Sequence, residues 1–132
     1  MHNSPPHTSG SGNPDAINVA ILPDAQARTA AIDPSRSFIV QAPAGSGKTE
    51  LLTQRYLCLL ARVEEPEQIL AITFTRKAAS EMRNRILQSL QRARATSRPD
   101  KAHEAHNWDL AQAALANDAR CGWQIESNPV RL

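Results

Sequence analysis

The sequence predicts an α/β domain in which helices flank a parallel β-sheet, and three observations favour this fold. A glycine-rich loop at residues 42–49 stands between an apolar run and a helical pattern. A second apolar run, at residues 69–74, changes directly into another helical pattern. The chain has 132 residues, which is room for one small domain. The predicted sheet is therefore small and incomplete.

Composition places the chain among soluble proteins, with 41% hydrophobic and 21% charged residues and a net charge of +2. Residues 1–18 are rich in Ser, Pro, Gly and His and are predicted to be a disordered tail without the features of a secretion signal. Residues 19–132 are predicted to form the domain. No apolar run is long enough to span a membrane, so a cytoplasmic location is expected. Cys58 and Cys121 are interpreted as free thiols.

The first half of the predicted domain contains two helices and a strand. A short helix at residues 24–32 ends before Pro34, and a strand follows at residues 37–41. A long helix at residues 50–63 comes after the glycine-rich loop. Its apolar stripe is expected to pack against the sheet: Leu52, Tyr56, Leu59, Leu60 and Val63.

The second half repeats the order of strand and helix. After the strand at residues 69–74, Thr75 is a suitable N-cap for a helix. The apolar face of that helix is expected to contain Ala79, Met82, Ile86 and Leu90. Residues 95–106 are polar and predict a loop, and a last helix at residues 107–120 ends at Gly122, a good C-cap. Trp108 and Trp123 are interpreted as packing residues.

The glycine-rich loop has the residue types that hold a polyphosphate. Gly45 and Gly47 allow a tight turn whose backbone N–H groups converge on phosphate oxygens, next to the positive end of a helix dipole. Lys48 can reach the β- and γ-phosphates, and the Thr49 hydroxyl can ligate Mg²⁺. The general pattern has glycine where Ala42 stands. The alternative interpretation is a loop that only turns the chain.

Basic residues are concentrated after the second predicted strand. Between residues 76 and 101 the sequence has eight basic and two acidic residues, apart from histidine. Such a stretch suits a polyphosphate such as single-stranded DNA, although beyond Arg85 a solvated helix face explains it equally well. Phe74 has two interpretations, as a residue that stacks on a base or as a core residue.

Two motifs together resemble the N-terminal ATPase domain of the UvrD/Rep class of superfamily 1 DNA helicases. Ala-x-Ala-Gly-Ser-Gly-Lys-Thr at residues 42–49 resembles motif I of that family, which often lacks the first glycine. Thr-Phe-Thr-Arg-Lys-Ala-Ala-x-Glu-Met-Arg at residues 73–83 resembles motif Ia, which lies along single-stranded DNA. Leu-Pro-Asp-Ala-Gln at residues 22–26 resembles the Q motif. Residues 108–132 look most like the RecB-like and AddA-like helicase-nuclease branch.

The resemblance implies a P-loop NTPase with a RecA-like sheet, and it implies roles for individual residues. Gln26 would bind adenine, Thr49 would ligate Mg²⁺, and ATP would be the nucleotide. The implied ATP-binding residues are Gln26, Ala42, Pro43, Ala44, Gly45, Ser46, Gly47, Lys48 and Thr49. The implied DNA contacts are Thr73, Phe74, Thr75, Arg76 and Lys77. The implied role is that of an ATP-dependent DNA helicase in recombinational DNA repair.

Hydrolysis in this family requires motif II, an apolar strand that ends in Asp-Glu, and no such run exists in the sequence. No later arginine that could stabilise the transferring phosphoryl group follows Arg131. The chain is therefore interpreted as the front part of a larger helicase, truncated before motif II and without catalytic residues of its own. Expected partners are single-stranded DNA, the remainder of the helicase polypeptide and a helicase-nuclease partner subunit.

Two other functions remain open. The first is a P-loop kinase or other nucleotide-binding module that is unrelated to helicases. The second is a remnant without function or stable fold, because a sheet that lacks its central strands leaves apolar faces and edges uncovered.

Overall fold

The computed structural model describes residues 24–41, 45 and 47–132, and within these ranges it contains helices but no β-strand. The predicted α/β fold with a RecA-like parallel sheet is therefore wrong for this part of the chain. The predicted tail at residues 1–18 lies outside the described residues, and so do residues 19–23, 42–44 and 46.

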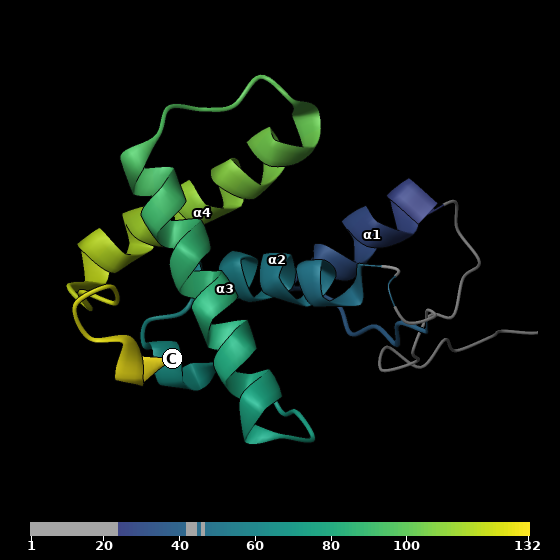
Figure 1. The fold of residues 1–132 in the computed structure, drawn as a ribbon, viewed down its shortest axis with the longest axis horizontal. Helices are drawn as coiled ribbons and strands as arrows, with labels where there is room; N and C mark the ends of the chain where they lie inside the picture. Colours follow the sequence, from purple (N-terminus) through teal and green to yellow (C-terminus); the bar gives the residue numbers. More distant parts are fainter. Residues whose placement is uncertain (1–23, 42–44, 46) are drawn as a thin grey trace, which may run out of the picture.

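The described residues form four α-helices and two short 3₁₀ helices, arranged as in Figure 1. In chain order they are α1 (Asp24–Ile32), α2 (Lys48–Leu60), η1 (Pro66–Gln68), α3 (Arg76–Ala95), α4 (Ala102–Cys121) and η2 (Pro129–Arg131). None of the described helices is long and apolar enough to cross a membrane. The described residues also contain no cluster of metal-ligating side chains.

The two apolar segments that predicted strands are exposed connections between helices. In residues 69–74, Leu70, Ile72 and Phe74 are 81%, 84% and 108% exposed. In residues 37–41, Ile39 and Val40 are also exposed. An apolar run becomes a strand only when a neighbouring strand pairs with its backbone N–H and C=O groups. Neither segment has such a partner within the described ranges, so no sheet forms there.

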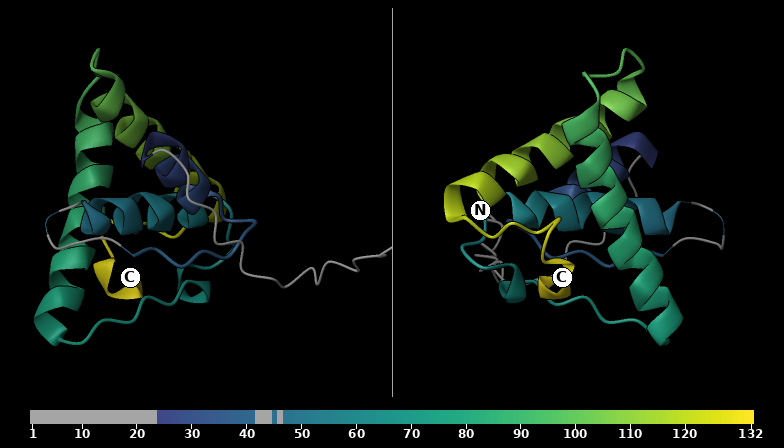
Figure 2. Two further views of the ribbon diagram at one scale, coloured as in Figure 1. Left: turned by 90° about the vertical axis from the view of Figure 1, so that its right-hand side faces the viewer. Right: turned by 60° about the vertical axis from the view of Figure 1, so that its left-hand side comes forward.

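The core lies where α2, α3 and α4 meet, and Figure 2 shows α3 crossing the other two helices. The buried core residues are Tyr56, Leu57 and Leu60 from α2, Ile86, Leu90 and Ala93 from α3, and Ala111, Ala114 and Leu115 from α4. The predicted apolar faces are partly wrong. Leu52 and Ala79 are exposed, whereas Leu57, which the prediction omitted, is buried. The helices pack on one another, so the buried side of α2 is the side that faces α3 and α4.

The predicted helix ends are confirmed where a cap residue marks them. The Thr75 hydroxyl accepts a hydrogen bond from Ala78 N at 3.0 Å, as an N-cap does. Gly122 ends α4 with φ 71°, a left-handed conformation that favours glycine. The predicted loop at residues 95–106 is wrong in its second half, because α4 begins at Ala102. Residues 102–106, which the sequence analysis assigned to a polar loop, are therefore the first residues of α4.

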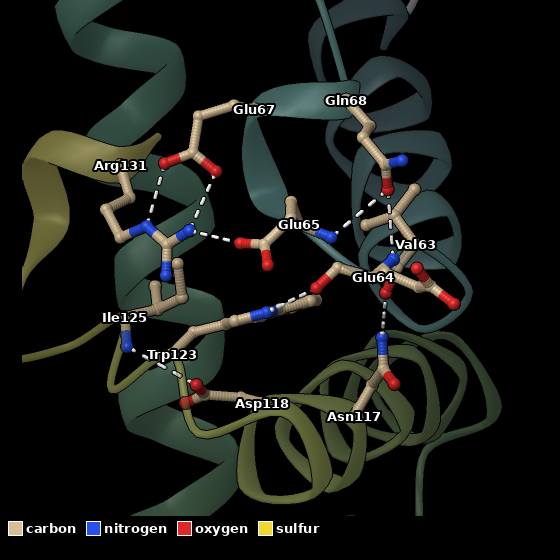
Figure 3. A network of polar contacts seen from close by, with 10 residues as sticks. All are labelled: Val63, Glu64, Glu65, Glu67, Gln68, Asn117, Asp118, Trp123, Ile125 and Arg131. Carbon is tan, nitrogen blue, oxygen red and sulfur yellow. Dashed lines mark hydrogen bonds and ion pairs between the residues drawn. The ribbon is translucent and has the colours of Figure 1, made fainter.

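The segment after α4 folds back onto the end of α2 (Figure 3). Trp123 and Ile125 are buried in the core, which confirms the packing role predicted for Trp123. The Trp123 indole donates to Glu64 O at 2.7 Å. Arg131 donates to both carboxylate oxygens of Glu67, at 2.7 and 2.9 Å, and to Glu65 at 2.5 Å. These contacts join the last residues of the chain to η1.

We expect the Arg131–Glu67 pair to make stability dependent on acidity. The hydrogen bonds from Arg131 lower the pKa of Glu67 below its ordinary value of 4.5. A lowered pKa in the folded state gives stability that is present above pH 4.5 and is lost as the pH falls through the folded-state pKa. Between pH 7 and pH 3, the melting temperature should therefore fall less steeply for Arg131→Gln than for the unchanged chain. Lys77→Gln, which removes an exposed charge elsewhere, should keep the original profile; an unchanged profile for Arg131→Gln would contradict the prediction.

Candidate nucleotide and nucleic-acid contact sites

Two glycines with a left-handed backbone conformation precede α2. Gly45 and Gly47 have φ values of 80° and 87°, in the region that side chains rarely adopt. Gly47 is the N-cap of α2, and no side chain caps the helix there. The first N–H groups of α2 therefore receive no cap from the Gly47 side, and they stand at the positive end of the helix dipole. Lys48 and Thr49 are the first two residues of α2, and both are exposed.

Arg28 is a residue of this region that the sequence analysis did not identify. A β-carbon added at Gly47 would lie 3.2 Å from a terminal guanidinium nitrogen of Arg28. The guanidinium of α1 therefore lies directly against the N-cap of α2. No sequence pattern indicated this contact, because it depends on how α1 packs against α2.

Arg55 holds α1 and the following turn in place. Its guanidinium donates to the carbonyl oxygens of Ala31, Asp33 and Arg36 at 2.7, 2.9 and 2.9 Å. Ala31 and Ile32 are buried against Leu51 of α2, in a small cluster separate from the main core. In the turn after α1, hydrogen bonds from Ser35 lower the pKa of Asp33. Packing and hydrogen bonding thus fix α1 beside α2.

A hollow of about 390 Å³ lies beside Lys48, between α1, α2 and the segment that follows α1. Its wall is mostly apolar and includes Ala31, Phe38, Val40 and Leu51, with Lys48 and Arg55 as its charged residues. The Phe38 ring lies under two guanidinium groups, at 5.2 Å from Arg36 and 5.9 Å from Arg55. An aromatic ring and a lysine therefore line the same hollow.

Gln26 stands on α1, the helix whose Arg28 lies against Gly47. Gln26 is exposed on α1. Among the described residues, its side chain makes no hydrogen bond to Lys48 or Thr49. Gly45, Gly47, Lys48 and Thr49 stand together at the start of α2. The predicted Ala42, Pro43, Ala44 and Ser46 lie outside the described residues.

The predicted DNA contacts form one exposed turn at the start of α3. Thr73 donates to Thr75 O at 2.9 Å, and Thr75 caps the helix as described above. These bonds fix the turn while Phe74, Arg76 and Lys77 project from it, and all three are exposed. Of the two interpretations of Phe74, the core position is therefore wrong, since its side chain is fully exposed.

The charges at the start of α3 are unfavourable for the helix itself. The first turn contains Arg76 and Lys77 and no acidic residue. Cations at a helix N-terminus oppose the helix dipole, which favours anions there, at a cost of roughly 0.3–1 kcal/mol each. An anion bound at this turn would reverse that effect. The arrangement is therefore suited to contact with a phosphate backbone.

The family model that describes the UvrD/REP helicase N-terminal domain matches residues 23–126. A similar relative is the exonuclease/helicase subunit RexA of Lactococcus lactis, with 40% identity over 62% of this chain and 7% of the relative. DNA helicase IV of Escherichia coli has 48% identity over 64% of this chain and 12% of its own length. The ATP-dependent DNA helicase UvrD1 of Mycobacterium tuberculosis has 49% identity over 47% of this chain and 8% of its own length.

No solved structure matches the chain. The matched part covers only a small share of each of these curated relatives, 7%, 12% and 8% of their lengths. The family match, by contrast, covers most of this chain and includes every predicted site residue. The loop, the start of α2 and the exposed turn before α3 all lie inside it. The chain belongs to the UvrD/REP helicase N-terminal domain family.

Proposed function

We propose that this chain is the ATP-binding and single-stranded-DNA-contacting part of an ATP-dependent DNA helicase of recombinational repair. The observation that supports it most directly is the start of α2, where two left-handed glycines precede Lys48 and Thr49. This arrangement suits the phosphates of a nucleotide. The chain has no Asp-Glu of the motif II type, so we expect it to bind ATP without hydrolysing it.

Each residue of the site would contribute one interaction. The Lys48 ammonium would neutralise phosphate charge, and the first N–H groups of α2 would donate to phosphate oxygens. The Thr49 hydroxyl would ligate Mg²⁺, which fits because this hydroxyl is exposed beside Lys48. Gln26 would bind the adenine, and Mg²⁺ when bound would offset the remaining phosphate charge.

The relatives favour a role within a larger assembly. RexA is named as a subunit of an exonuclease/helicase, and other relatives are named as DNA helicases. By analogy this chain would act with the remainder of a helicase polypeptide and a helicase-nuclease partner subunit, in the cytoplasm. The family to which the chain belongs speaks against an unrelated kinase or nucleotide-binding module.

The DNA contact can be tested at the exposed turn before α3. We expect Arg76→Ala/Lys77→Ala to weaken binding of a fluorescein-labelled dT oligomer by about tenfold at low salt, because two phosphate contacts are removed. Fluorescence anisotropy at several salt concentrations would measure it. Arg62→Ala/Lys101→Ala removes the same charge from distant exposed positions and should change binding by less than about twofold. Equal losses for both double variants would mean that net charge, and not this turn, binds DNA.

A further inference from the structure

In Figure 1, α3 passes across α2 and α4. Residues of these three helices, among them Arg85 and Arg92 of α3, line a polar cleft. Its volume is about 240 Å³. Thr53 and Gln54 of α2 and Asn107 of α4 form the opposite wall, and Leu57 lies at its base. Between the two arginines, α3 adds the polar residues Gln88 and Ser89. We refer to this feature as the arginine cleft.

The two arginines of the cleft differ from Arg94 and Arg98 in having no acidic partner among the described residues. Arg94 pairs with Glu126 at 2.9 Å, and Arg98 pairs with Asp109 at 2.8 Å. Within the part of the chain that the structure describes, neither Arg85 nor Arg92 lies within ion-pair distance of a carboxylate. Both are exposed. Their guanidinium groups are therefore available to an external anion.

The acidic residue of the cleft is held by groups of α4. Glu50 Oε1 lies 2.9 Å from His103 Nε2 and accepts from Asn107 Nδ2 at 3.0 Å. The Asn107 oxygen in turn accepts from Gln54 at 2.5 Å. These contacts hold the Glu50 carboxylate against α4. Glu50 therefore weakens the positive potential of the cleft without cancelling it.

The spacing of the basic residues suits an extended chain of phosphates. Arg85 and Arg92 are seven positions apart on α3, which is about 10 Å along the helix axis. Lys77 lies two turns before Arg85, near the turn proposed to contact DNA. In all, α3 carries six basic residues against one acid, Glu81. A strand that contacts the start of α3 can thus continue along the helix to the cleft.

We propose that the arginine cleft binds the phosphodiester backbone of single-stranded DNA, as a second contact beyond the turn at residues 73–77. The proposal rests on the proposed DNA-binding function. Arginine is the side chain best suited to such a contact, because its planar guanidinium can donate two parallel hydrogen bonds to a phosphate. Bases are not read here, so the contact should be independent of sequence.

The test uses the purified chain, a fluorescein-labelled dT oligomer and anisotropy titrations at increasing NaCl. We expect Arg85→Ala/Arg92→Ala to weaken binding about tenfold at low salt. The slope of log K against log salt should become shallower by about 1.4, since each phosphate contact to a single strand contributes about 0.7. The control Arg62→Ala/Lys101→Ala removes the same two charges outside the cleft and should change affinity by less than about twofold.

A gain of affinity gives a second test that a folding defect cannot imitate. Glu50→Gln removes the negative charge of the cleft and should tighten dT binding roughly threefold at low salt, with no effect at high salt. Affinity that stays the same or falls at low salt would count against the proposal.

The outcomes separate this proposal from the proposed function. If Arg76→Ala/Lys77→Ala weakens dT binding and the cleft variant matches its control, the cleft proposal is overturned and the proposed function stands. If the cleft variant weakens binding of ATP and not of dT, the cleft serves a free nucleotide and the proposal is also overturned. If the unchanged chain does not bind dT at low salt, both fail.

Discussion

Lys48→Ala is expected to weaken binding of Mg·ATP by roughly 10- to 100-fold. The ammonium group is exposed at the first position of α2, directly after the left-handed N-cap Gly47. A hydrogen bond between a charged group and a phosphate contributes roughly 1.5–3 kcal/mol, and each 1.4 kcal/mol is about a factor of ten in affinity. Isothermal titration calorimetry with Mg·ATP would measure the loss directly.

Lys77→Ala is the matched control for Lys48→Ala, because it removes the same charge from an exposed first turn of another helix. It should leave ATP binding within about twofold of the unchanged chain. Thr49→Val should reduce the dependence of ATP binding on Mg²⁺ while ATP alone still binds. Retained ATP affinity in Lys48→Ala would remove the main support for a nucleotide site at α2. In the intact helicase, Lys48→Ala should abolish ATP hydrolysis.

Asn117→Leu is expected to destabilise the fold by roughly 2–4 kcal/mol. The Asn117 amide is buried and donates to Leu60 O at 2.7 Å. It also donates to Val63 O at 2.8 Å (Figure 3). The last carbonyl groups of a helix have no partner within the helix, so α4 supplies one for the end of α2. Leucine has a similar size but no donor, and each buried group left unsatisfied costs roughly 1–3 kcal/mol.

The measurement is thermal unfolding followed by circular dichroism, in which the loss should lower the melting temperature by roughly 10 °C. Asn84→Leu places the same side chain at an exposed position of α3 and should change stability by about 0.5 kcal/mol or less. A cooperative transition in the unchanged chain would also contradict the reading of this chain as an unfolded remnant. If Asn117→Leu has the same melting temperature as Asn84→Leu, the hydrogen bonds from Asn117 to the end of α2 do not contribute to stability.

Local sequence signals predicted the helices well where a residue has one clear local preference. The helix at Asp24–Ile32 has the predicted bounds, and Thr75 and Gly122 mark helix ends as expected. A threonine N-cap and a glycine with positive φ act through neighbouring backbone atoms. Their effect can therefore be predicted from the local sequence, without knowledge of the tertiary structure. Gly45 and Gly47 followed the same rule.

Local sequence signals could not predict whether two distant segments pair as β-strands. The apolar runs at residues 37–41 and 69–74 have strand-like composition, yet neither pairs with a strand among the described residues, and most of their residues are exposed. A strand needs hydrogen-bond partners from another segment, and apolar periodicity says nothing about whether such a segment lies alongside. The prediction of the buried face of α2 was partly wrong for the same reason. Which side of a helix is buried depends on the elements that pack against it, and the sequence pattern does not show them.

The sequence by itself determined the family motifs, the glycine turn before Lys48 and the basic start of α3, because these depend on residue identity and short-range geometry. Only the tertiary structure decided that Arg28 lies against Gly47, that Arg55 joins α1 to α2, and that Arg131 joins the last residues to η1. It also decided that Arg85 and Arg92 share a cleft with α2 and α4. Each of these contacts joins residues from different elements, and the packing of the helices is what sets the distance between them.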